Sequence, residues 1–178
     1  GCWTKRGCAI PARWCWAWEL AAETGRHGTQ MHKQDTKLEA EGAEFLVLAQ
    51  LLLQRIPAYK TYTNMPGYDL VATNPDTNRL ARIQVKSRWR TGARFFLINN
   101  LACDFVVAVR LNRGKKGGGG EVSSPEYFVL PIQVVESHLR DRDGPWQKVR
   151  FDDISKLKED YKEKWSLIAD FLDETVSP

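Results

Sequence analysis

The amino-acid sequence predicts an α/β domain in which a central mixed β-sheet is flanked by helices. Three features predict this class: a long helical segment comes first, three short strands with clear turn signals follow, and strands and helices then alternate. The domain is expected to span residues 31–178. Residues 1–30, rich in tryptophan and cysteine, are interpreted as an atypical extension outside it.

The composition is typical of a soluble globular protein. Apolar residues make up 43% and charged residues 27% of the 178 positions. No apolar run reaches the roughly 20 residues that a membrane helix needs, and no secretory signal is recognisable. A cytoplasmic protein is therefore expected. The four cysteines lack the spacing of zinc ligands, and no disulfide framework is expected among Cys2, Cys8, Cys15 and Cys103.

Residues 37–54 are expected to form the first helix. Apolar residues recur there at helical spacing, namely Leu38, Leu48, Leu51 and Leu52. Asp35 or Thr36 is suited to cap its start. Glu44 precedes Leu48 by four residues, so it is placed on the apolar face, where a charge needs a partner or a function. The alternative is that Glu44 is an ordinary exposed acid on another face.

Three short strands are expected next, joined by turns at residues 64–67 and 74–78, and they occupy residues 60–63, 68–73 and 80–88. Side chains of the third strand alternate between two faces. One face holds Ala81, Ile83, Val85 and Ser87, and the other holds Arg82, Gln84, Lys86 and Arg88. The first face is expected to be packed and the second to carry polar chemistry. Alternatively, the polar set is only the solvated side of an edge strand.

The second half of the chain is expected to complete the sheet and its helical layers. Residues 94–98 are compatible with a strand and 99–102 with a short helical connection. The β-branched run at 104–111 predicts a buried strand, and a basic, mobile loop is expected at 113–124. A strand at 126–130 leads into a short helix at 131–138. A final helical region is expected to start at Asp152 or Asp153, with one face formed by Tyr161, Trp165, Ile168 and Leu172.

Four polar residues are expected to converge at one end of the sheet: Glu44, Asp69, Gln84 and Lys86. The hairpin of the second and third strands brings Asp69 to the same face as Gln84 and Lys86. Carboxylate and amide oxygens are ligands that Mg²⁺ accepts. Lys86 can orient or deprotonate a water molecule, or stabilise developing charge. Together these groups suit phosphodiester hydrolysis, although Asp69 alone also fits a turn residue.

Several segments resemble the PD-(D/E)XK nuclease superfamily, in its branch with Q-x-K in place of D/E-x-K. They are GAE at 42–44, PGYDLV at 66–71 and RIQVKS at 82–87, with DFVVAVRL, EYFVLPIQVV, GPW and KEKW later in the chain. The resemblance implies a restriction-endonuclease-like αβββαβ core, a DNA substrate and Mg²⁺ dependence, with Mn²⁺ as a substitute.

The same resemblance implies a role for each of the four residues. Glu44 matches the acid on the helix and Asp69 the metal-binding aspartate. Gln84 matches the variable metal ligand and Lys86 the lysine. Gln84 departs from the common pattern because its amide carries no negative charge, so weaker metal affinity is expected.

A basic stripe lies between residues 79 and 94, which include six basic side chains and no acid. Arg82, Arg88 and Arg90 are expected to contact DNA phosphates, together with Lys115 and Lys116 in the glycine-rich loop. The alternative is a charged strand edge that resists aggregation. The net charge of +4 by itself says little about partners.

The function expected from the sequence is a Mg²⁺-dependent endonuclease acting on DNA, with no organic cofactor and no membrane. Its glycine run lacks the Lys-Ser/Thr and following helix of a P-loop. A homodimer is favoured if a domain with one site cuts both strands. Two alternatives stay open: a catalytically inactive nuclease-like domain that binds nucleic acid or a partner protein, and an interaction module unrelated to nucleic acid.

Overall fold

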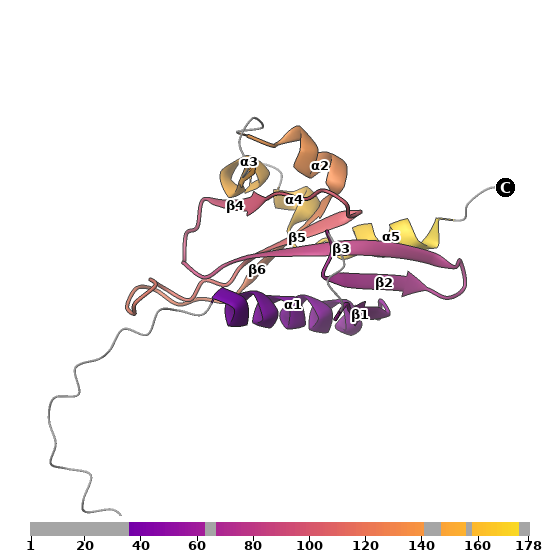
Figure 1. Ribbon diagram of the computed structural model, residues 1–178, viewed down its shortest axis with the longest axis horizontal. Coiled ribbons are helices and arrows are strands. Elements are labelled where there is room, and N and C mark those ends of the chain that lie inside the picture. Colours follow the sequence, from indigo (N-terminus) through magenta and orange to yellow (C-terminus); the bar gives the residue numbers. More distant parts are fainter. Residues whose placement is uncertain (1–35, 63–66, 141–146, 156–157, 175–178) are drawn as a thin grey trace, which may run out of the picture. The chain divides into compact units, whose positions relative to one another are not determined.

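The computed structural model describes residues 36–62, 67–140, 147–155 and 158–174. The elements in these ranges follow one another as α1 (Thr36–Leu53), β1 (Ala58–Lys60), β2 (Leu70–Asn74), β3 (Arg79–Arg88), β4 (Phe95–Ile98), β5 (Phe105–Arg110), β6 (Glu126–Pro131), α2 (Ile132–Ser137), β7 (Gln147–Arg150), α3 (Phe151–Ser155), α4 (Lys158–Tyr161) and α5 (Ser166–Asp173) (Figure 1). The expected extension at residues 1–30 lies outside the described residues.

A five-stranded mixed sheet with the strand order β1-β2-β3-β5-β6 forms the centre of the domain. Strands β1, β2 and β3 form an antiparallel meander, β5 runs parallel to β3, and β6 returns antiparallel to β5. A separate antiparallel ribbon consists of β4 and β7. The predicted α/β class, with a central mixed sheet and flanking helices, is confirmed.

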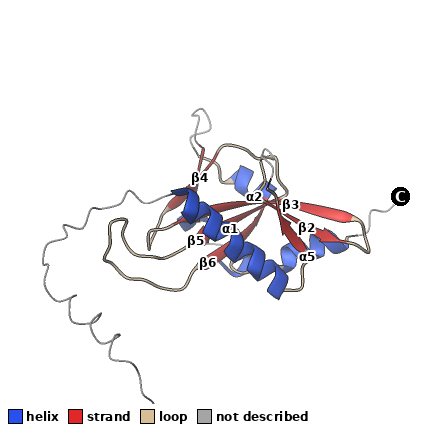
Figure 2. Cartoon of the chain, turned by 60° about the horizontal axis from the view of Figure 1, so that its bottom comes forward, coloured by secondary structure: helices blue, strands red, loops and turns tan. Residues whose placement is uncertain are grey.

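Each face of the sheet packs against its own layer. On one face, buried residues of β2, β3 and β5 contact α1 and α5 through side chains such as Val47, Ile83 and Ile168. On the other face, Val106 and Phe128 pack under the β4–β7 ribbon, α2 and α3. Figure 2 shows α1 lying across the front of the sheet. The alternation predicted for β3 is confirmed, because Ala81, Ile83 and Val85 all belong to the first of these clusters.

Helix α1 begins and ends close to the predicted limits, but its buried face differs from the expected one. The buried residues are Ala43, Val47 and Leu51. Leu38 and Leu52 were expected on this face, and they are instead exposed. Leu51 is buried and Leu48 packs against the first cluster, as predicted. The leucine pattern included Leu38 and Leu52 wrongly because apolar residues occur on several sides of this helix. The proposed cap Asp35 lies outside the described residues.

The strand predicted at 60–63 lies earlier in the chain: β1 runs from Ala58 to Lys60 and shares only Lys60 with the prediction. The reason is that Ala58 is buried in the first cluster and pairs with Ala72 of β2. The predicted turn at 64–67 falls largely on undescribed residues, but Gly67 is described. It has a φ of +104°, and an added Cβ would lie 2.9 Å from the Cβ of Ala102. Glycine therefore lets the start of β2 approach the 100–102 segment closely.

The short helix predicted at 99–102 does not form. The side chain of Asn100 accepts a hydrogen bond from the Ala102 N–H at 2.8 Å, and the Cys103 N–H bonds the Leu101 carbonyl. Such local bonds compete with helical ones. The connection from β3 to β5 therefore contains strand β4, close to the strand predicted at 94–98, and no helix between β4 and β5.

The predicted C-terminal helical region is divided into α3, α4 and α5. Glu163 has a φ of +54° and donates its N–H to the Tyr127 carbonyl, which interrupts the helix beside β6. Trp165, Ile168 and Leu172 share the first cluster as expected, whereas Tyr161 packs against the second. In the described part of the chain, no helix is both long and apolar enough to cross a membrane.

Candidate functional site

Strands β2 and β3 separate beside Asp69, and this separation creates the candidate site. Their last paired residues are Leu70 and Ile83. Beyond that pair, the Asp69 N–H donates to the Ile83 carbonyl at 2.9 Å, and the Val85 N–H donates to Oδ2 of Asp69 at 2.7 Å. The carboxylate thus replaces the lost strand partner of Val85. One oxygen is held by the backbone, which leaves the other to bind a cation.

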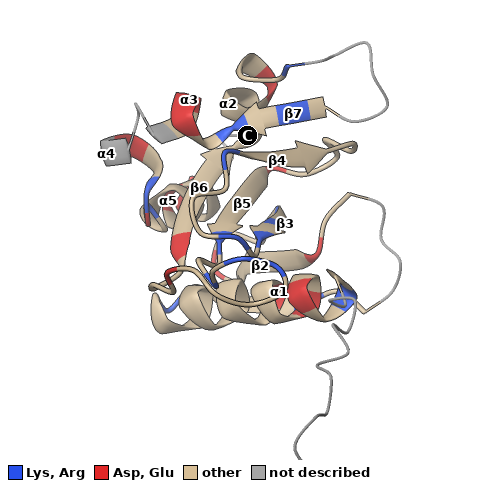
Figure 3. Ribbon diagram, turned by 90° about the vertical axis from the view of Figure 1, so that its left-hand side faces the viewer, with Lys and Arg blue, Asp and Glu red and all other residues tan. Residues whose placement is uncertain are grey.

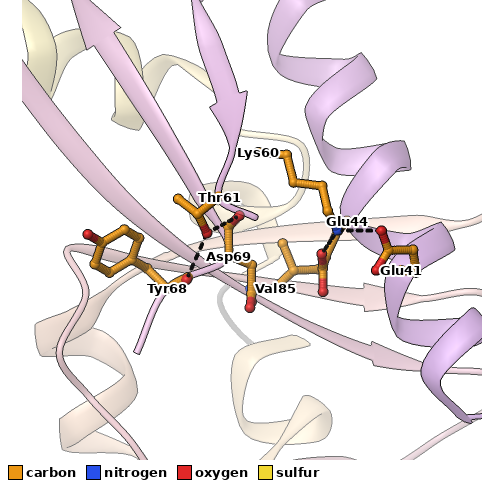
Figure 4. A network of polar contacts seen from close by, with 7 residues as sticks. All are labelled: Glu41, Glu44, Lys60, Thr61, Tyr68, Asp69 and Val85. Atoms are coloured by element: carbon orange, nitrogen blue, oxygen red, sulfur yellow. Dashed lines mark hydrogen bonds and ion pairs between the residues drawn. The ribbon is translucent and has the colours of Figure 1, made fainter. Parts of the chain in front are cut away.

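Glu44 reaches this region from α1 and is not an exposed helix acid. Its side chain is only 17% exposed and accepts a hydrogen bond from Nζ of Lys60 on β1. The same ammonium contacts Glu41 at 2.8 Å. Figure 4 shows Lys60 extending from its strand to the two helix acids, with Asp69 and Val85 beside them.

The surroundings of Glu44 have opposite effects on its pKa. Burial raises the pKa of Glu44 above its ordinary value, and the negative charge of Asp69 raises it further, while the hydrogen bond from Lys60 lowers it. Burial alone would lower the pKa of Lys60, but its bonds to Glu41 and Glu44 outweigh that effect and raise it. Glu44 and Asp69 therefore repel each other, and a nearby cation would stabilise both.

Gln84 is buried although its side chain is polar. It is 5% exposed, and its Oε1 atom accepts no hydrogen bond in the structure. A buried carbonyl oxygen without a donor costs free energy, which a metal ion or a water molecule would recover. Because side chains alternate along β3, this amide lies on the same face as Lys86.

Lys86 is a partly buried lysine on β3. Burial lowers its pKa below the ordinary value, while the negative charges of Asp69 and Glu44 act in the opposite direction. A lysine with a lowered pKa has a larger neutral fraction near neutral pH, so its Nζ can accept a proton. Cys103 is a buried thiol, and burial raises its pKa to about 11.

The structure thus brings Glu44, Asp69 and Lys86 close enough for their charges to interact, with Gln84 next to Lys86 in the strand. Among the described residues, no group of three or more His, Cys, Asp or Glu side chains is placed to hold a metal. The candidate set contains only two carboxylates, and its third oxygen is the unpaired amide of Gln84. Two repelling carboxylates and an orphaned carbonyl oxygen fit a hard divalent cation.

A basic cleft lies at the end of β3 that follows Lys86. It has a volume of about 980 Å³, and its basic lining consists of Arg88, Arg90, Arg94, Lys115 and Lys116. Trp89, Phe95 and Glu39 complete much of the wall, and Lys116 lies 3.6 Å from the Glu39 carboxylate. In Figure 3, blue segments gather near β3 and α1.

The cleft adjoins the candidate site along two elements. Lys86 and Arg88 are two residues apart on one face of β3, a separation of about 7 Å. Glu39 and Glu44 are five residues apart on α1, a rise of about 7.5 Å. A chain of phosphates in the cleft would therefore extend toward the carboxylates.

Arg82 does not line this cleft. Its guanidinium donates to Oδ2 and Oδ1 of Asp104 at 3.0 and 2.9 Å. The backbone N–H of Arg82 also bonds that carboxylate, at 2.7 Å. The structure therefore brings together four of the five basic residues expected to contact DNA and places Arg82 elsewhere, in an ion pair.

Comparison with known proteins assigns no family to the chain. No family model and no curated protein matches it. Among solved structures it is similar to a bacterial homing endonuclease, I-Ssp6803I, with 22% identity and a TM-score of 0.48. The similarity covers 75% of this chain and 91% of the endonuclease. A similarity of this extent assigns no activity to this protein.

Sequence reasoning missed Lys60 and Glu41. A single lysine on a short strand has no distinguishing pattern, and its ion pairs depend on how β1 packs against α1. Arg94 lines the cleft but was not among the residues expected to contact DNA. The basic stripe between residues 79 and 94 includes Arg94 and could have indicated it.

Proposed function

We propose that this protein is a Mg²⁺-dependent endonuclease that hydrolyses DNA phosphodiester bonds. The observation that carries the proposal is the opening between β2 and β3, where Asp69, Glu44 and Lys86 interact beside a buried amide oxygen without a donor. The resemblance of these residues to the Q-x-K branch of PD-(D/E)XK nucleases supports it.

Asp69, Glu44 and Gln84 would hold the cation, with Mn²⁺ as a substitute for Mg²⁺. When bound, the ion would lower the pKa of its water and neutralise charge on the phosphate. The Val85 N–H orients the Asp69 carboxylate by holding Oδ2. Lys60 keeps Glu44 ionised and positioned through their hydrogen bond.

Lys86 would accept the proton of the attacking water at Nζ. Its lowered pKa supports this role, because a neutral amine is needed for proton transfer. If Lys86 instead stays charged, it stabilises negative charge in the transition state. Arg88, Arg90, Lys115 and Lys116 would bind phosphates in the cleft, which gives affinity for DNA without sequence specificity.

Cleavage of supercoiled plasmid and branched DNA with Mg²⁺ or Mn²⁺ tests the proposal. The wild-type protein should cut, and Asp69→Ala and Lys86→Ala should each abolish cutting. Asp76→Ala and Lys164→Ala are matched controls because both residues are exposed and lie outside the site. The controls should cut as the wild type does. Loss of cutting in the controls as well would show that the assay reports stability and not the site.

One observation favours a second candidate, a catalytically inactive domain that binds DNA. The Lys60 ammonium already neutralises part of the negative charge at Glu44 and Glu41, which reduces the need for a metal. Calorimetric titration with Mg²⁺ separates the two candidates. Heat of binding that disappears in Asp69→Ala supports the enzyme. Absence of heat, together with intact DNA binding and no cutting, supports the inactive domain.

A further inference from the structure

Helix α1 carries an apolar stripe on the side that faces away from the sheet. Its large members are Leu38, Phe45, Leu46, Leu52 and Leu53, and they are 72%, 46%, 38%, 53% and 74% exposed. The opposite side of the helix is also apolar and buries Ala43, Val47 and Leu51 in the core. A helix that is apolar on two opposite sides is normally covered on both of them. In Figure 1, no described element lies beyond α1 on its outer side.

The area of this outer stripe is that of a protein interface. Tyr62 extends it, because its ring and that of Phe45 both lie against the Lys60 ammonium, at 5.9 and 5.1 Å from the ring centroids. With about 200 Å² for each large apolar side chain when fully exposed, these six residues expose on the order of 700 Å². A stable complex buries about 800 Å² on each partner, whereas the largest patch on a monomer is typically 300–600 Å².

The spacing within the outer stripe is self-complementary. Leu38 and Leu52 lie seven residues before and seven residues after Phe45. A two-fold axis through Phe45 would therefore place Leu38 of each copy near Leu52 of the other. Gly42 and Ala49 flank Phe45 on the same side, and no atom lies within 4 Å of a Cβ added at Gly42. These small residues leave room for the ring of a second copy.

The charges of α1 favour an antiparallel arrangement. The first half of α1 has three acids, Glu39, Glu41 and Glu44, and one base, Lys37, whereas the second half has no charged residue and is followed by Arg55. Parallel helices would bring the acidic halves together, and antiparallel helices set each acidic half against a half without acids. Antiparallel helix dipoles add to this preference.

We propose that the outer stripe of α1 binds a second copy of this chain, in an antiparallel two-fold dimer centred on Phe45. The inference does not rest on the proposed nuclease function. It does concern the site, because Phe45 covers the Lys60 ammonium that pairs with Glu44. Dimerisation would therefore bury this ion pair more deeply and bring two candidate sites toward one axis.

Sedimentation equilibrium of the full chain at micromolar concentrations tests the dimer. The wild type should have twice the 20.4 kDa mass of one chain. Leu38→Glu combined with Leu52→Glu should give a monomer with unchanged circular dichroism, because both residues are exposed. Leu80→Glu is the matched control, since Leu80 is 61% exposed on β3 and lies outside the stripe. A monomeric wild type, or a dimer that survives the double substitution, overturns the proposal.

Cysteine cross-linking tests the position of the axis. In a chain with Cys2, Cys8 and Cys15 replaced by serine, Phe45→Cys should form a disulfide between two copies. Leu38→Cys should not, because an antiparallel pairing places residue 38 far from its equivalent. Cross-linking at both positions would indicate a parallel arrangement, and absence of cross-linking at position 45 would contradict the two-fold axis at Phe45.

Discussion

At the scale of single residues, the charged forms of Glu44 and Lys86 are each disfavoured by burial and favoured by a neighbouring charge of opposite sign. Burial raises the pKa of Glu44 and lowers that of Lys86, so the protein environment disfavours the charged form of each. The hydrogen bond from Lys60 lowers the pKa of Glu44 and so favours its ionised form. The charge of Asp69 raises the pKa of Lys86 and so favours its protonated form. Opposing environments of this kind are typical of acid–base sites and cost stability.

Replacing Lys86 by methionine should stabilise the protein at neutral pH, by about 1 kcal/mol. The folded-state pKa of Lys86 lies below its ordinary value of 10.5, so folding is opposed by the cost of a buried ammonium. This destabilisation is fully present below the folded-state pKa of Lys86. It decreases as pH rises above that pKa and disappears near 10.5, where the lysine of the unfolded chain also loses its proton. Thermal melts of both proteins from neutral to alkaline pH should converge. A gap that widens with pH would contradict the lowered pKa.

Replacing Lys60 by methionine should shift the acidic limb of the pH–rate profile to higher pH. The hydrogen bond from Lys60 lowers the pKa of Glu44, so its loss lets burial and Asp69 raise that pKa further. Lys60→Arg keeps the charge and should keep most of the wild-type profile. A uniform loss of rate at every pH in Lys60→Met would indicate a merely structural role.

At the scale of elements, the separation of β2 from β3 determines where the candidate site lies. Pairing through Leu70 and Ile83 holds the hairpin, and the remainder of β3 pairs only with β5. The free side of β3 is closed at Val85 by the Asp69 carboxylate. Beyond it, Arg88 and Arg90 enter the basic cleft with the loop that joins β5 to β6. One strand thus connects the candidate metal ligands to the residues proposed to bind phosphates.

The double substitution Arg88→Ala with Arg90→Ala should weaken DNA binding. It should also reduce the slope of log K against log salt concentration by about 2, because each phosphate contact contributes about 0.9. Arg82→Ala is the control, and it should leave the slope unchanged because that guanidinium is paired with Asp104. Fluorescence anisotropy with labelled DNA at several salt concentrations measures the affinity and the slope for each protein. An equal effect of Arg82→Ala would place DNA outside the cleft.

At the scale of the whole molecule, packing on both faces of the sheet fixes the orientation of every side chain in β3. Ile83 is fully buried under α1, and the buried β5 supports the opposite face through Val106 and Ala108. A shift of one residue in register would exchange Ile83 for Gln84 in the core. The candidate site is therefore maintained by the same contacts that stabilise the domain.

Ile83→Ala should destabilise the domain by about 2–5 kcal/mol, because it leaves a cavity at the centre of the first cluster. Leu80→Ala in the same strand should change stability by less than about 0.5 kcal/mol, because Leu80 is largely exposed. Urea denaturation measures both. Similar effects at the two positions would mean that the alternation in β3 is wrong.

The sequence by itself determined those elements whose signals are local. The first helix, the hairpin, the alternation in β3 and the strand at Phe105–Arg110 were predicted within a few residues, because periodicity and turn residues depend only on neighbours. The order of Glu44, Asp69, Gln84 and Lys86 along those elements also made their proximity predictable.

Only the tertiary structure decided which partners these residues meet. The β4–β7 ribbon, the pairing of Lys60 with Glu44 and the ion pair that removes Arg82 from the cleft all join segments far apart in the chain. The division of the C-terminal helices follows from the bond between the Glu163 N–H and the Tyr127 carbonyl of β6. Such contacts depend on packing between elements, which local periodicity does not encode.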